Sequence, residues 1–98
     1  MECDQALDVL RRNRVELSRR GVQRAALFGS TARGQADPDS DLDILIELDP
    51  DVLLDVFSYV ALTDFIRDLF RVRVDVANSD ALKPHVRTSA QRDAIYAF

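Results

Sequence analysis

Residues 41–48 of this chain alternate between apolar and other side chains with a period of two. Two sets therefore fall on opposite faces: Leu42, Ile44, Ile46 and Leu48 on one, and Asp41, Asp43, Leu45 and Glu47 on the other. Because successive side chains of a β-strand point to opposite sides, this period predicts a half-buried strand. The 98 residues suffice for one small core, so we expect a single domain over residues 1–98.

The rest of the chain supplies helical and extended patterns around that strand. Before it we expect a helix within 3–20 that ends at Gly21, a strand over 22–28 and a short helical turn capped by Ser30. After it we expect a helix from Val52 to Phe70, a strand over 72–77, a capped turn at Asn78–Asp80 and a last helix within 85–97. Phe57, Phe65 and Leu69 are the core candidates of the long helix. The order α-β-α-β-α-β-α predicts an α/β (α+β) domain around a short mixed sheet.

Composition excludes several classes of protein. Hydrophobic residues at 47% and charged residues at 31% are typical of soluble globular chains. No apolar run approaches the roughly 20 residues that span a bilayer, and the first residues lack the pattern of a signal peptide. The single cysteine, Cys3, excludes a disulfide framework and a cysteine-based zinc site. We therefore expect a cytoplasmic protein, and the net charge of −4 argues against direct nucleic-acid binding.

The acidic residues are concentrated in the middle of the chain. Residues 37–66 carry nine Asp or Glu and neither Lys nor Arg. One interpretation is a solvated loop followed by the polar face of a helix. The other is that some of these carboxylates lie together around a divalent cation, which offsets their mutual repulsion. Composition does not choose between the two, so spacing must.

The spacing of three aspartates favours a shared site. Asp41 and Asp43 are two residues apart on the expected strand, so both point to the face away from Leu42 and Ile44. Asp75 lies between two valines of the strand over 72–77. If the two strands are neighbours, three carboxylates converge on one face, where they could hold divalent ions. The alternative is that each is an ordinary exposed residue.

Gly29 and Ser30 lie where the first strand meets a helical turn. Glycine allows close approach, and backbone N–H groups at such a junction can bind an anion. Ser30 adds a hydroxyl donor, and Arg33 adds a charge that can contact phosphate oxygens. Gly-Ser pairs are also common in ordinary turns. An anion site facing a pair of carboxylates is nevertheless what a metal-bound triphosphate requires.

These residues carry a family resemblance. Gly29-Ser30, ten further residues and Asp41-Leu42-Asp43 resemble the motif of the DNA polymerase β-type nucleotidyltransferase superfamily. The run from Phe28 to Leu45 is similar to its minimal nucleotidyltransferases, many of which are antitoxins of HEPN-domain toxins. Val74-Asp75-Val76 and the following Ala81–Pro84 resemble the stretch that bears their third acid.

The resemblance implies a site and a reaction. Asp41, Asp43 and Asp75 would be the catalytic acids and ligands of two Mg²⁺ ions, with Asp75 helping to activate the attacking hydroxyl. Gly29, Ser30 and Arg33 would bind the nucleotide. The expected reaction is transfer of AMP from Mg-ATP to a hydroxyl, specifically a tyrosine, of a HEPN-type toxin, which the protein would neutralise as its antitoxin.

Two other functions stay open at this stage. The protein could be a non-catalytic antitoxin, a binding module that masks the active surface of its partner. Transfer to a small molecule is a further alternative, although relatives of that kind use an additional domain for the acceptor. His85 reads as an exposed residue at a helix start, and Tyr96 and Phe98 as part of a partner surface. Association of identical chains is compatible with so small a sheet with an open edge.

Overall fold

The fold consists of helices on both sides of a short sheet. A computed structural model describes residues 2–32 and 41–98, the side chains of residues 30 and 31 excepted. In chain order the elements are α1 (Cys3–Arg12), α2 (Arg14–Arg19), β1 (Val22–Leu27), α3 (Gly29–Ala32), β2 (Leu42–Leu48), α4 (Val56–Asp68), β3 (Val74–Asn78), the 3₁₀ helix η1 (Ser79–Ala81), α5 (Pro84–Asp93) and β4 (Ile95–Tyr96). The expected order is confirmed, with two additions: a break at Asn13 between α1 and α2, and the short strand β4.

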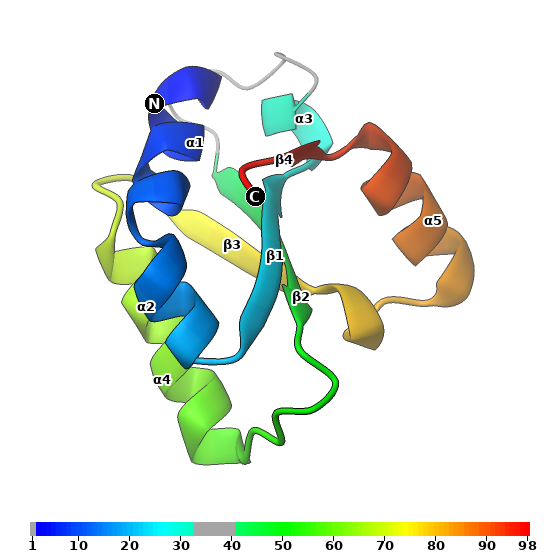
Figure 1. The fold of residues 1–98 in the computed structure, drawn as a ribbon. Coiled ribbons are helices and arrows are strands. Elements are labelled where there is room, and N and C mark those ends of the chain that lie inside the picture. The colour runs from blue at the N-terminus through cyan, green and yellow to red at the C-terminus, as the bar shows by residue number, and fades with distance from the viewer. Residues whose placement is uncertain (1, 33–40) are drawn as a thin grey trace.

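The four strands form a mixed sheet in the order β3-β2-β1-β4. β1 runs antiparallel to both β2 and β4, whereas β2 and β3 are parallel and are connected by α4. Figure 1 shows β2 and β1 in the middle of the sheet. The small α+β domain with a mixed sheet agrees with the fold class predicted from the sequence.

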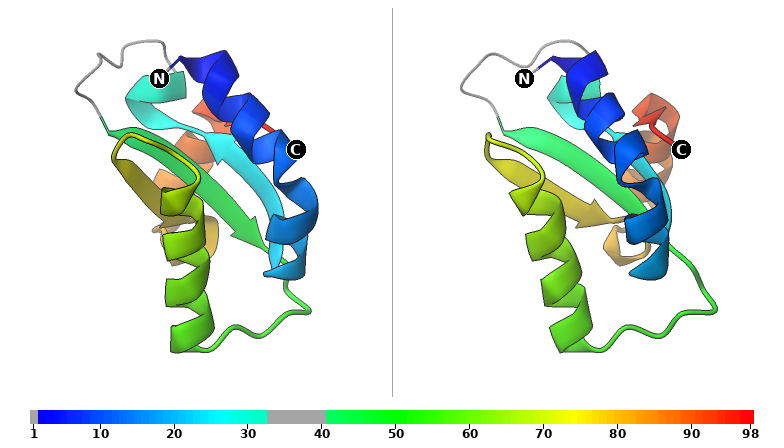
Figure 2. Two further views of the ribbon diagram at one scale, coloured as in Figure 1. Left: turned by 90° about the vertical axis from the view of Figure 1, so that its left-hand side faces the viewer. Right: turned by 60° about the vertical axis from the view of Figure 1, so that its left-hand side comes forward.

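One face of the sheet carries the main core. Figures 1 and 2 show α1, α2 and α4 together on this side. The largest side chains buried there are Leu10 and Leu17 from the first two helices, Leu27, Ile44 and Ile46 from the strands, and Leu62 and Ile66 from α4. The alternation of residues 41–48 is thus confirmed for its apolar face.

The opposite face is covered by less of the chain. There α5 is the main helix (Figure 1). Ala26 and Leu45 are register partners on this face and both are fully buried. Leu45 thus lies on the face opposite Ile44, as predicted, but the expectation that only one face of this strand is buried was wrong at Leu45, because the second face is also partly covered. Nearby, the Tyr96 hydroxyl donates to Glu47 Oε2 at 2.5 Å, and the Arg24 guanidinium lies 3.8 Å from the Tyr96 ring centroid.

The long helix is shorter than its apolar pattern predicts. Asp55 caps it, accepting a hydrogen bond of 2.7 Å from the Ser58 backbone N–H. That bond also holds the pKa of Asp55 below its ordinary value. The cap fixes the helix start at Val56, so residues 52–54 belong to the preceding loop.

Phe57 was wrongly predicted to be in the core, since 85% of its surface is exposed. At about 100° per residue, it lies about 180° around α4 from Ile66, which faces the sheet. Phe65 and Leu69 are partly buried and pack against the core, as expected. Within the described part of the chain, no helix is long and apolar enough to cross a membrane.

Candidate active site

Two of the predicted acids lie opposite each other on neighbouring strands. Asp43 of β2 and Asp75 of β3 are register partners in the parallel pair, which confirms that these strands are neighbours. Their side chains point to the same face of the sheet, because paired residues of adjacent strands share a face. Asp41 directly precedes β2 and is exposed, as is Asp75, whereas Asp43 is half-buried. All three residues thus lie near the end of the sheet at which β2 and β3 begin.

The carboxylates are suited to a hard cation, but they are not gathered around one point. Carboxylate oxygens are the ligands that Mg²⁺ prefers. Over residues 2–32 and 41–98, however, no three His, Cys, Asp or Glu side chains lie close enough together to hold a metal ion. The donor chemistry therefore fits the metal predicted from the sequence, while the roles of Asp41, Asp43 and Asp75 as its ligands stay predictions.

Arg73 is a charged neighbour of the acids that the sequence reasoning missed. Its Nε lies 3.8 Å from Asp41 Oδ1, and its carbonyl accepts a hydrogen bond of 2.8 Å from the Leu42 N–H. Both side chains are largely exposed, so their ion pair contributes little to stability. The available signal was its position two residues before Asp75, which places both side chains on one face.

Gly29 fits tightly against Asp43. The Phe28 N–H donates to the Asp43 carbonyl at 3.1 Å, so the end of β1 is bonded to the start of β2. Gly29 follows with a φ of +63°, and a Cβ built on it would lie 2.8 Å from Asp43 Oδ2. A side chain at residue 29 would therefore force the Asp43 carboxylate to shift. The close approach that the structure describes is that of the Asp43 carboxylate, whereas the predicted approach of an anion to Gly29 stays a prediction.

The other predicted nucleotide-binding residues are described only in part. Ser30 lies inside α3, which begins at Gly29, so the expectation that Ser30 caps the helical turn from outside it was wrong by one residue. Arg33 lies outside the described residues. Their predicted contacts with phosphate accordingly stay predictions.

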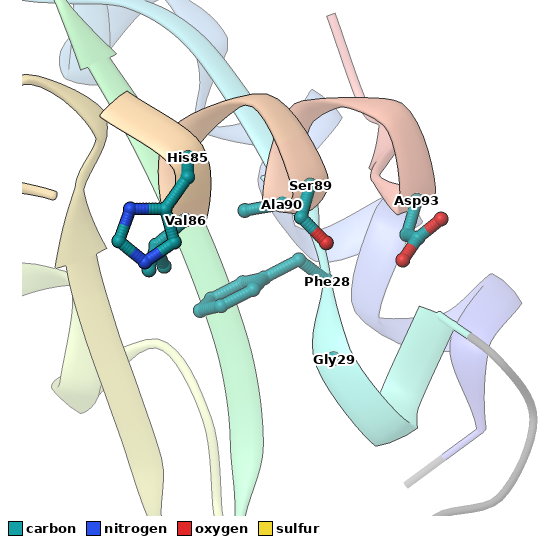
Figure 3. Close-up of a pocket in the computed structure, with 7 residues that line it drawn as sticks. All are labelled: Phe28, Gly29, His85, Val86, Ser89, Ala90 and Asp93. Atoms are coloured by element: carbon teal, nitrogen blue, oxygen red, sulfur yellow. The ribbon is translucent and has the colours of Figure 1, made fainter. Parts of the chain in front are cut away.

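A cavity of about 330 Å³ adjoins Gly29. It is lined by Phe28 and Gly29 from the end of β1 and by His85, Val86, Ser89, Ala90 and Asp93 from α5. In Figure 3 the Phe28 ring points toward His85 and Val86, below the first turns of α5. The lining is mainly apolar, with polar groups at its margin. Because Gly29 lines the cavity and also contacts Asp43, the cavity lies next to the acids.

The residues of α5 that line this cavity were not assigned to the site from the sequence. His85 is exposed near the start of α5, as expected, yet it forms part of the cavity wall. His85, Ser89 and Asp93 follow one another at intervals of four, which places them along one side of a helix. That spacing was the signal in the sequence, and only the packing of α5 beside Phe28 gives it meaning.

Comparison with known proteins identifies the class to which this fold and these acids belong. Residues 7–97 match the model of the nucleotidyltransferase domain family. The chain belongs to that family, whose members are nucleotidyl-transferring enzymes.

Two relatives illustrate the similarity at the level of sequence. A protein of Methanocaldococcus jannaschii, provisionally named a protein adenylyltransferase, is 36% identical over 93 residues, which are 91% of each chain. The protein adenylyltransferase MntA of Thermococcus cleftensis is 30% identical over 89 residues, covering 90% of this chain and 88% of the relative.

Solved structures show the same fold. One described provisionally as a minimal nucleotidyltransferase superimposes with a TM-score of 0.72 at 33% identity, covering 97% of this chain and 95% of the other. A complex of a tri-AMPylated HEPN toxin of Shewanella oneidensis with an MNT antitoxin contains a chain that matches with a TM-score of 0.62 at 15% identity. That match covers 94% of this chain and 71% of the other, and it supports the fold alone.

Proposed function

We propose that this protein transfers AMP from Mg-ATP to a hydroxyl group of a partner protein. The observation that carries the proposal is the position of Asp43, which lies between Gly29 on one side and Asp75 on the neighbouring strand. A phosphate-binding turn against a pair of carboxylates is the arrangement that a metal-bound triphosphate needs. Family membership adds support of a separate kind.

In this proposal each acid has a distinct role. Asp41, Asp43 and Asp75 would hold two Mg²⁺ ions, which would neutralise the negative charge of the phosphates. Asp75 also accepts the proton of the attacking hydroxyl. The acceptor oxygen forms a bond to the α-phosphorus, the bond to the bridging oxygen breaks, and pyrophosphate leaves from the Gly29-Ser30 side. Arg33 contributes positive charge to the leaving phosphates.

The cavity beside Gly29 is the proposed place of the nucleoside. Its volume and its mainly apolar lining suit a planar base, and it lies next to the acids. Ala90→Leu fills part of the cavity without introducing charge. We expect this variant to raise the KM for ATP severalfold at an unchanged rate in saturating nucleotide, while exposed Val15→Leu leaves both unchanged. An unaltered KM for Ala90→Leu would place the base elsewhere.

The proposed acceptor is a tyrosine of a HEPN-type toxin, which makes this chain the corresponding antitoxin. The support comes from the names and descriptions of similar proteins, which include protein adenylyltransferases and complexes of HEPN toxins with their antitoxins. A further complex is described as bound to AMP-PNP, an analogue of ATP.

A second candidate is a binding module that neutralises the toxin without transfer. It is favoured by the separation of the carboxylates, since no three acidic or other metal-binding side chains of the described segments gather at one point. It would still require a partner of the same kind, so only an assay of the reaction distinguishes it from the enzyme.

The test is transfer of label from α-labelled ATP to the HEPN-type partner in the presence of Mg²⁺. We expect wild-type protein to label the partner and Asp43→Asn to lower the rate by at least about a thousandfold, the scale of a lost metal-ligand contribution. Asp68→Asn removes an exposed acid at the end of α4 and should leave the rate unchanged. Complex formation without labelling by the wild type would favour the binding module.

A further inference from the structure

An exposed apolar surface lies far from the acids. We define the α4 patch as Val52 and Leu53 of the loop before α4 and Val56, Phe57 and Val60 of its first turns. Leu53 is 95% exposed and Phe57 is 85% exposed, Val56 is also mostly in solvent, and Val52 and Val60 are between a third and a half exposed. Scattered exposed apolar residues are ordinary, but five within nine consecutive positions form a continuous patch of the kind that marks an interaction site.

The α4 patch borders a hollow that can receive side chains. A cavity of about 440 Å³ is lined by three of the patch residues, Val52, Leu53 and Val56, together with Leu48, Leu54, Asp55, Tyr59, Asn78 and Ala81. The first turns of α4 are apolar on nearly all sides, although only the later turns pack Leu62 and Ile66 against the sheet. A helix that faces water on one side normally carries polar residues there. The combination of a ridge and a hollow is typical of a docking surface for a helix.

The charges around the patch select the partner. Asp49, Asp51 and Asp55 lie in the same loop as Val52 and Leu53, and residues 37–66 contain neither Lys nor Arg. Gly21 contacts this loop, but the neighbouring Arg19 and Arg20 are both paired with Glu16. A two-fold contact between copies of the α4 patch would bring acidic loops together. Charge complementarity instead favours a different chain with a basic border.

We propose that the α4 patch docks an amphipathic helix of a partner protein, with an apolar ridge that is flanked by Arg or Lys. The patch begins where β2 ends, whereas Asp41 and Asp43 lie at the start of that strand. Figures 1 and 2 show α3 and the first turn of α4 at opposite ends of the molecule. The separation along β2 is about 20 Å. A partner docked on the patch therefore leaves the nucleotide cavity open.

One test measures affinity for the HEPN-type partner without nucleotide, and this arm rests on the proposed function. We expect the double variant Leu53→Ser/Phe57→Ser to weaken binding by at least about tenfold, as expected for the loss of two central apolar contacts. Asp51→Lys should weaken binding severalfold at low salt and less at high salt. Val15→Ser is the matched control, because Val15 is an exposed apolar residue on α2. All four substituted residues are exposed, so thermal unfolding should match the wild type.

A second probe keeps the two proposals separable. Two helical peptides share one leucine ridge, but one is flanked by Arg and the other by Glu. We expect the Arg peptide to bind at least about tenfold more tightly than the Glu peptide and to lose binding to the double variant. If the HEPN-type protein does not bind while the Arg peptide does, the proposed function fails and the docking proposal stands. Equal affinity of both peptides would overturn it, as would a dimer of the chain that the double variant abolishes.

Discussion

The two faces of the sheet use the same strand for different purposes. On the face covered by α1, α2 and α4, Ile44 and Ile46 of β2 are fully buried in a continuous core. On the other face β2 presents half-buried Asp43, fully buried Leu45 and half-buried Glu47. The first face is closed by three helices, whereas α5 is the main helix over the second (Figure 1). Rigid packing on one side thus holds in place the polar groups that stay accessible on the other.

This difference predicts that stability and chemistry depend on alternate residues of one strand. Asp43 and Ile44 are adjacent in sequence, yet a substitution at one should affect mainly the reaction and at the other mainly the free energy of unfolding. The predictions below test how far that separation holds.

The largest effect on stability is expected at Ile44. Ile44→Ala removes a fully buried side chain from the core and should lower the free energy of unfolding by about 2–4 kcal/mol. The AMP-transfer rate per folded molecule should change little. Urea unfolding and a labelling assay below the transition measure both quantities. Asp43→Asn is the comparison variant, with the opposite expected pattern, and equal losses of activity in the two would contradict the separation.

Two glycines give a smaller and more selective comparison. Gly21 and Gly29 both have positive φ, where a residue with a side chain costs about 1–3 kcal/mol. We expect Gly21→Ala and Gly29→Ala to destabilise the protein to a similar extent. Only the second places a methyl group against Asp43 Oδ2, so only Gly29→Ala should also lower the transfer rate of the folded protein. Loss of transfer in both variants would mean that the contact with Asp43 is unimportant.

The smallest expected effect is on the free energy of unfolding at alkaline pH, and it comes from Tyr96, near the second face. Burial and the hydrogen bond to Glu47 raise the pKa of Tyr96 to about 12. The unfolded chain releases this proton near pH 10, so the folded state binds more protons between pH 10 and 12. The stabilisation is therefore complete below pH 10 and is lost as the pH rises toward 12. Urea unfolding should show a steeper decline in this range for wild type than for Tyr96→Phe; identical slopes would contradict the assignment.

The sequence predicted the elements better than it predicted their surroundings. The period of two over residues 41–48 specified the strand and the side on which Asp43 lies, because alternation follows from strand geometry. It did not reveal that Leu45 is covered, since that depends on packing on the second face. Phe57 was misplaced because the first turns of α4 are apolar nearly all round, and composition does not tell which side faces the sheet. β4 was missed because two residues carry no periodic pattern.

The residues of the candidate site also fall into those that a local sequence pattern indicates and those that depend on packing. Asp41, Asp43 and Gly29 were identified from a local motif, and Asp75 from its strand pattern. The cavity wall on α5 and the contact of Arg73 with Asp41 depend on residues far apart in sequence, so the local spacing of these residues gains meaning only from the packing. The acidic character of residues 37–66 had two interpretations. The docking proposal adds a third for Asp49, Asp51 and Asp55, which would form the charged border of the α4 patch.

The position of β3 at the edge of the sheet has a consequence for how long the acid site persists. Among the residues that the structure describes, β3 is hydrogen-bonded as a strand only to β2, because it is the last strand in the order β3-β2-β1-β4. A strand held along one side can detach by local opening while the rest of the sheet stays folded. Asp75 leaves with that strand, whereas Asp43 stays on β2. The lifetime of the assembled acids is therefore governed by the fraying of one edge strand, and we expect catalytic capacity to decline in mild denaturant before the core unfolds.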